Sequence, residues 1–98
     1  MRRERLDADT VRAEIAIVNR LGLHARAAAR FVETANRFAA DVTVANGEEK
    51  VSGKSILGLM MLAAAEGTTL TVVATGPDAE EAVAALAELV AQRFHEGA

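Results

Sequence analysis

Hydrophobic and polar positions alternate over residues 11–17, where Val11, Ala13, Ile15 and Ile17 are two residues apart. A period of two is typical of a strand with one buried face. The alternation recurs at residues 41–45 and 69–75, and a short exposed strand is expected at 48–51. Asn46-Gly47 favours a type I′ hairpin turn, so at least one pair of strands is expected to be antiparallel.

Between these strands the apolar spacing changes to three and four, which predicts amphipathic helices. The first begins near Ala25 and continues to about Phe38. The second extends from Ile56 to about Ala65, with Ser55 as N-cap and Gly67 as the stop after it. The third follows the turn Gly76-Pro77-Asp78, and its apolar stripe continues to Phe94.

The predicted order is strand, helix, strand, strand, helix, strand, helix. Four strands and three helices in one short chain imply an α+β fold of two layers, with the helices covering one face of the sheet. Residues 1–10 are polar and are expected to form a flexible N-terminal extension. Residues 11–98 are expected to form a single domain.

Composition narrows the possible functions of the 98 residues. The chain has no cysteine, which excludes disulfides and thiolate metal sites, and no other metal-ligand cluster or cofactor is expected. The formal charge of −3 argues against a nucleic-acid binder. The longest apolar stretch is too short to span a bilayer, and no signal peptide is recognised, so a cytoplasmic location is expected.

One histidine combines several features of a reactive site. Gly22 interrupts regular structure before His24, and good helix formers follow it, so His24 is expected in a loop at a helix N-terminus. Unpaired amides at such an end favour anions, phosphate included, and disfavour the protonated ring. Arg26 adds charge-assisted hydrogen bonds for a phosphoryl group. The alternative is an ordinary surface histidine, whereas His95 is expected in a solvated tail.

Two features of the second predicted helix are ambiguous. Ser55 is either an ordinary capping serine or a phosphorylation site beside an apolar surface. The stripe Ile56, Leu57, Met60 and Met61 is either core or an exposed interaction surface, for which methionine is well suited.

Two motifs carry a resemblance to a known family. Leu21-Gly22-Leu23-His24-Ala25-Arg26 resembles the active-site signature of the histidine-containing phosphocarrier (HPr) family of the bacterial phosphotransferase system. Lys54-Ser55-Ile56-Leu57-Gly58-Leu59-Met60 resembles its second signature, and Thr75-Gly76-Pro77-Asp78 is a looser third match. The resemblance covers residues 11–94 and implies a four-stranded antiparallel sheet under three helices.

The same resemblance implies a stoichiometric carrier rather than an enzyme. His24 would accept a phosphoryl group on Nδ1 from phosphorylated enzyme I and pass it to an EIIA-type domain, with Arg26 beside it. Ser55 would be the regulatory site of HPr kinase/phosphorylase. Partners would dock on an apolar surface formed by Leu23, Ala29, Ile56, Leu57 and Met60. A cofactor-free cytoplasmic monomer is expected, and Ala27 replaces the family's proline with little effect on the chemistry.

Other functions remain open on the sequence alone. The chain could be a regulatory module of the same fold, controlling transcription or metabolism through Ser55 or serving a nitrogen-type branch instead of sugar uptake. An α+β RNA-binding domain is disfavoured, because such domains stack bases on sheet aromatics. The aromatic residues here, Phe31, Phe38 and Phe94, are all outside the predicted strands.

Overall fold

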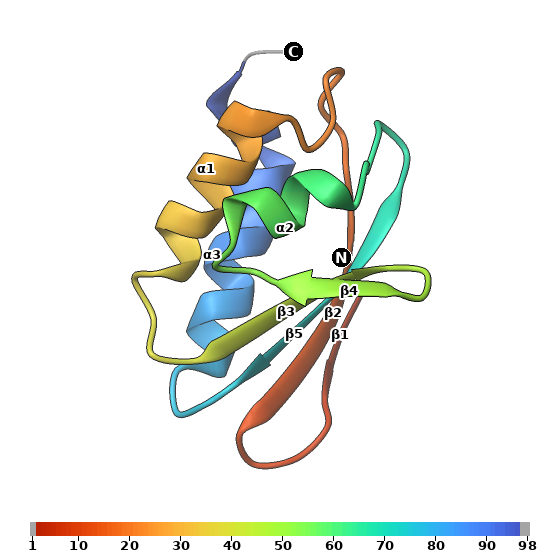
Figure 1. Cartoon of the computed structure of the whole chain (residues 1–98). Coiled ribbons are helices and arrows are strands. Elements are labelled where there is room, and N and C mark those ends of the chain that lie inside the picture. Colours follow the sequence, from red (N-terminus) through yellow and green to blue (C-terminus); the bar gives the residue numbers. More distant parts are fainter. Residues whose placement is uncertain (1, 97–98) are drawn as a thin grey trace.

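The computed structural model describes residues 2–96. Its sheet contains β1 Arg2–Arg5, β2 Thr10–Ala16, β3 Asp41–Asn46, β4 Glu49–Ser52 and β5 Thr69–Thr75. Its helices are α1 Ala25–Ala35, α2 Ile56–Met61 and α3 Ala79–Ala91, followed by the 3-10 turn η1 Arg93–His95. The strand order is β1-β2-β5-β3-β4, and each neighbouring pair is antiparallel. The helices lie on one side of this sheet (Figure 1).

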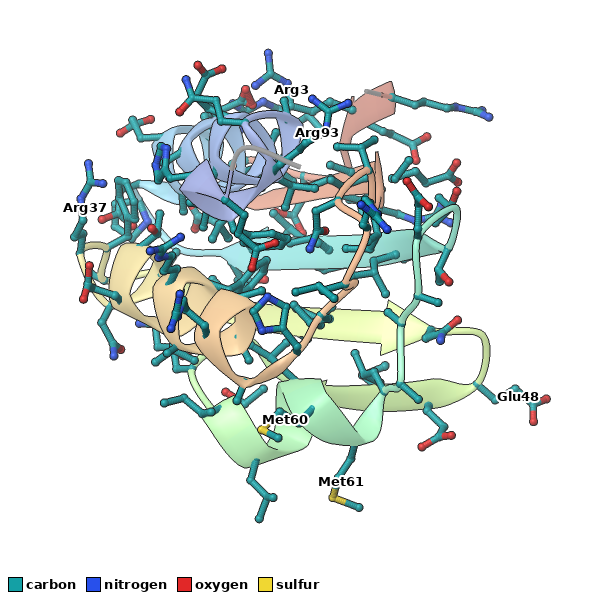
Figure 2. All side chains as sticks on the ribbon, turned by 90° about the horizontal axis from the view of Figure 1, so that it is seen from above. Arg3, Arg37, Glu48, Met60, Met61 and Arg93 are labelled. Atoms are coloured by element: carbon teal, nitrogen blue, oxygen red, sulfur yellow. The ribbon has the colours of Figure 1, made fainter. Side chains whose placement is uncertain are left out.

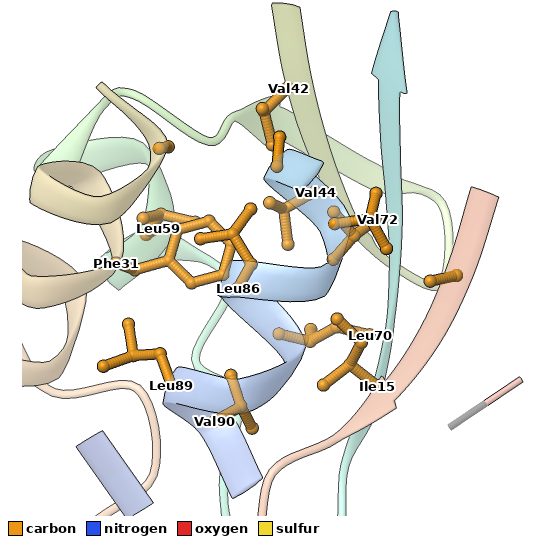
Figure 3. Packing of buried hydrophobic residues seen from close by; sticks show 14 of the residues in the cluster. Ile15, Phe31, Val42, Val44, Leu59, Leu70, Val72, Leu86, Leu89 and Val90 are labelled. Carbon is orange, nitrogen blue, oxygen red and sulfur yellow. The ribbon is translucent and has the colours of Figure 1, made fainter. Parts of the chain in front are cut away.

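The core fills the space between the sheet and the helices (Figure 3). Alternate strand residues such as Val44, Leu70 and Val72 are almost completely buried, as their period of two predicts. Phe31 from α1 and Leu86 from α3 meet them from the helical layer. The α+β architecture with two layers and helices on one face is therefore confirmed.

The expected number of strands is wrong, because the described residues contain five strands and not four. The additional strand, β1, lies within the segment predicted to be a flexible extension and pairs with residues 11–14 of β2. All four of its residues are charged and exposed, so neither face of the strand is buried. The sequence therefore lacks the alternating hydrophobic pattern that would predict a strand. Its ladder to β2 is accompanied by ion pairs from Arg3 and Arg5 to Glu80 of α3, at 3.7 and 3.3 Å.

Several helix ends also differ from those predicted. The second helix ends at Met61, and Ala63 follows with a φ of 51°, a left-handed conformation that stops the helix well before Gly67. The first helix ends at Ala35 instead of Phe38. The third ends at Ala91, although Phe94 beyond it is fully buried, because η1 turns back toward the core.

Candidate functional site

The loop before α1 is fixed by a glycine. Gly22 has a φ of +67°, and a Cβ at this position would lie 2.4 Å from the carbonyl oxygen of Ala64. The next amide, of Leu23, donates to the same oxygen at 2.9 Å. The loop therefore packs closely against the segment that follows α2, which only glycine permits.

This loop places His24 at the N-cap of α1, as the sequence predicts. Its backbone is extended, with φ −76° and ψ 178°, and its carbonyl accepts from the amide of Ala28 at 2.8 Å. The side chain makes no capping bond and is 28% exposed, so solvent reaches the imidazole. The first-turn amides of a helix lack acceptors within the helix and favour an anion at this end.

An open hollow of about 590 Å³ lies beside the ring. It is lined by His24 together with residues from the preceding loop, the start of α1 and the C-terminal turn: Arg20, Leu21, Ala25, Arg26, Arg30, His95 and Glu96. Three arginines thus surround a surface that is large enough for a phosphoryl group and positively charged. His24 and Arg26 both line this hollow. His95 is exposed, but it lies in the turn η1 and lines this hollow, whereas a solvated tail was expected.

Sequence analysis missed the residue in direct contact with His24. Nε2 of the ring donates to Oε2 of Glu96, and Nδ2 of Asn19 donates to the other carboxylate oxygen at 2.9 Å. Asn19 is completely buried and also donates to the carbonyl of Gly22 at 2.8 Å. No local pattern marks Glu96, because the contact joins the two ends of the chain.

Electrostatics favour the ionised form of this carboxyl. Burial of Glu96 raises its pKa, but hydrogen bonds from His24 and Asn19 and the charge of Arg30 outweigh that effect. The net result is a pKa below the ordinary value of 4.5. A carboxylate on Nε2 holds the ring proton there, which leaves the lone pair of a neutral ring on Nδ1.

Exposed apolar side chains gather on α2. Ile56, Leu57, Met60 and Met61 are 43%, 69%, 42% and 65% exposed, and Met61 projects outward in Figure 2. Leu59 is the residue of this helix that points into the core. These four side chains therefore form an exposed apolar surface and are not part of the core.

The expected docking surface needs one correction. Leu23 is only 4% exposed, because its side chain fills the core beneath the loop, so it is not available to a partner. Ala29 is partly buried on α1. Ala27, at the position of the family's proline, is fully buried in the first turn of α1.

Ser55 caps α2 as predicted. Its backbone is extended, and its Oγ accepts from the amide of Gly58 at 3.0 Å. The neighbouring Lys54 extends its amine to the carbonyl of Phe38 at 3.0 Å, which ties this loop to the segment after α1. Ser55 is partly exposed, at the end of α2 from which the apolar side chains Ile56 and Leu57 begin.

Residues 2–96 contain no group of three or more histidine, cysteine or carboxylate side chains that could hold a metal ion. In the same part of the chain, no helix is both long enough and apolar enough to cross a membrane.

Comparisons with known proteins point to one family. A family model described as "PTS HPr component phosphorylation site" matches residues 11–92. The phosphocarrier protein HPr of Pseudomonas aeruginosa is 53% identical over 85 residues, which are 86% of this chain and 94% of the relative. That of Neisseria meningitidis serogroup A is 47% identical over 87 residues, 89% and 98% of the two chains. The crystal structure of HPr from Thermoanaerobacter tengcongensis superposes with a TM-score of 0.83 at 42% identity, and the match covers 87% of this chain and 96% of that one.

Two further relatives carry different names. The phosphocarrier protein NPr of Shewanella violacea is 43% identical over 83 residues, 85% of this chain and 91% of its own. Crh of Bacillus subtilis, named for catabolite repression, is 47% identical, with a TM-score of 0.69 and coverage of 76% and 85%.

Proposed function

Because this chain belongs to the HPr family of phosphocarrier proteins, we propose that it carries a phosphoryl group on Nδ1 of His24. Phosphorylated enzyme I is the donor, and a histidine of an EIIA-type domain is the acceptor. The observation that carries the proposal is the placement of His24. The ring is exposed to solvent at the N-cap of α1, beside Arg26, with Nε2 on a carboxylate.

The transfer balances without an added reactant. The Nδ1 lone pair forms a bond to phosphorus while the bond from phosphorus to the donor imidazole breaks, and its electron pair returns to the donor nitrogen. The proton on Nε2 stays in place, so the phosphorylated ring carries a positive charge that the Glu96 carboxylate offsets. Onward transfer repeats the exchange in the opposite sense.

The surroundings of His24 stabilise the phosphoryl oxygens. Amides of the first turn of α1 are available as donors, and the guanidinium of Arg26 lines the same hollow. These groups are fixed before the reaction, so little reorganisation is needed during transfer. Since the chain is itself modified once per cycle, it acts as a carrier and not as an enzyme.

Ser55 and the exposed side chains of α2 support a second part of the proposal. Ile56, Leu57 and Met60 of α2, together with the partly buried Ala29 of α1, form the docking surface for enzyme I and EIIA-type domains. Phosphate on Ser55, added by an HPr kinase/phosphorylase, would place a dianion at the edge of this surface and weaken the binding of acidic partners. The chain would do this as a cytoplasmic monomer.

The alternative is a regulatory module, as the name of the Crh relative, which refers to catabolite repression, suggests for that protein. Such a module would bind a transcriptional regulator in its Ser55-phosphorylated form and make little use of His24. Capture of a partner only by the phosphoserine form, with His24→Ala harmless in cells, would favour it. The presence of His24 with Arg26 and Glu96 favours carriage.

The test uses enzyme I and phosphoenolpyruvate with a radioactive phosphoryl group. We expect an acid-labile label on the full chain that disappears in His24→Ala. His95→Ala is the matched control, because it removes the other of the two histidines and should keep the label. An unlabelled wild-type chain, or a label that survives in His24→Ala, would overturn the proposal.

A further inference from the structure

The chain after α3 adopts an unusual backbone. Arg93, Phe94 and His95 have φ values of 55°, 54° and 62°, three successive left-handed residues none of which is glycine. L-residues adopt this conformation rarely and seldom in a run. Such a turn persists only where contacts around it fix it. Phe94, which is fully buried, supplies one of these contacts from within the turn.

Two side chains from outside the turn supply the others. Nη1 of Arg30, on α1, donates to the carbonyl of Phe94. Nδ2 of Asn19, in the loop before His24, donates to Glu96. The turn consequently lies beside the start of α1 (Figure 1), and Glu96 reaches Nε2 of His24 from the opposite end of the chain.

We propose that Asn19, Arg30 and Glu96 are positioning residues that set the tautomer of His24. Held by Asn19 and by the turn that Arg30 fixes, the carboxylate keeps the ring proton on Nε2 and the lone pair on Nδ1. The inference rests on the proposed function, because it concerns the nitrogen that accepts the phosphoryl group. It explains why a strained turn ends on a carboxylate that contacts the ring.

Glu96→Gln is the sharpest test because it keeps the shape of the side chain. Asn19 donates and therefore holds the oxygen of the new amide, which leaves the amide NH2 facing Nε2. A donor there requires Nε2 to accept, so the proton moves to Nδ1 and blocks the nucleophile. Nitrogen NMR of the labelled ring at about pH 9, where imidazole is neutral, reports the tautomer directly. If the contact between Glu96 and His24 only stabilised the fold, the substitution would leave the tautomer of His24 unchanged.

Arg30→Gln tests the support of the turn, and Arg93→Gln is its matched control. Both remove one positive charge, but Arg93 is exposed on the turn and projects away from the core (Figure 2). We expect the Nε2 proton resonance of His24 to be sharp in the wild type and in Arg93→Gln. In Arg30→Gln it should broaden, because the carboxylate is no longer fixed.

Rates of labelling by phosphorylated enzyme I complete the test. We expect a loss of about a hundredfold in Glu96→Gln and about tenfold in Arg30→Gln, in the range found when the partner of a functional histidine is removed. Wild-type tautomer and wild-type rate in Glu96→Gln would overturn the inference while leaving the proposed function intact. No label on the wild-type chain would overturn the proposed function, and the ring spectra would still test the positioning.

Discussion

Gly22 shows how one residue fixes the position of the reactive loop. In Gly22→Ala the added Cβ meets the backbone of Ala64 and the residue must keep a positive φ. We expect a loss of about 2–4 kcal/mol in the free energy of unfolding, since strain and a backbone clash add together. Urea unfolding of the purified chain measures it.

Gly47→Ala separates the two contributions. Gly47 has a similar φ of +62°, but a Cβ added to it would meet no other atom within 4 Å. Strain alone should cost about 1 kcal/mol there. Equal losses in the two variants would contradict a role for the contact between Gly22 and the segment after α2.

The lowered pKa of Glu96 predicts a pH dependence with a definite sign. A carboxyl whose pKa is depressed in the folded chain contributes stability above its ordinary value of 4.5, and loses it as the pH falls through the folded pKa. The difference in unfolding free energy between the wild type and Glu96→Gln should therefore shrink as the pH falls below 4.5. Denaturant titrations over this range measure it. A difference that does not shrink as the pH falls below 4.5 would show that the carboxylate is not stabilised by its contacts.

His24 and Ser55 could be located from the sequence because their signals are local. A helix start is encoded by a few neighbouring residues, which include Gly22 before His24 and the good helix formers after it. Asn19 and Glu96 could not be located, since the hydrogen bond between them joins residues 77 positions apart. Such a contact depends on the packing of α3 and η1, and no short pattern records it.

Ser55 connects the stability of α2 with the proposed docking surface. Ser55→Ala removes the acceptor for the Gly58 amide and should cost about 1 kcal/mol. Ser55→Asp keeps a good cap, so its stability should remain near that of the wild type. It also places a negative charge beside Ile56 and Leu57, and we expect binding to enzyme I to weaken by about tenfold.

Calorimetric titration and thermal unfolding separate these effects. Ser52→Asp is the control, because it adds the same charge at an exposed position three residues earlier, at the end of β4, and leaves the capping side chain in place. Binding should weaken more in Ser55→Asp than in Ser52→Asp. Equal weakening would mean that net charge, and not the place of the charge, decides the affinity.

The ends of elements were harder to predict than their existence. Period-two and helical spacings identified β2, β3, β5 and the three helices, because each buries one face on the same core. The second helix is shorter than its apolar run, since Leu62 and Ala64 are buried outside the helix. An apolar residue thus indicates burial more reliably than it indicates helix.

At the scale of the whole molecule, the question is whether β1 is part of the domain or an addition to it. We propose that residues 11–98, of which 97 and 98 lie outside the described part of the chain, form the domain. The strand β1 is then an addition held by its ladder to β2 and by exposed ion pairs to Glu80 and Arg12. Its charged residues gave no hydrophobic signal, because an edge strand exposed on both faces has no buried side. The one available indication of β1 was that β2 would otherwise be an edge strand with unpaired backbone groups.

Deleting residues 2–6 tests this division, because the rest of the chain keeps Asp9, whose carbonyl accepts from Gly76 at 2.8 Å. We expect cooperative unfolding, a loss of only about 1–2 kcal/mol and unchanged labelling of His24, since exposed ion pairs contribute little. A full-length variant with Arg3→Gln, Glu4→Gln and Arg5→Gln removes the ion pairs that β1 makes to Glu80 and Arg12. Its difference from the truncated chain therefore measures the ladder. Loss of cooperative unfolding on truncation would instead make β1 an integral part of the domain, with the edge of β2 unable to stay ordered without it.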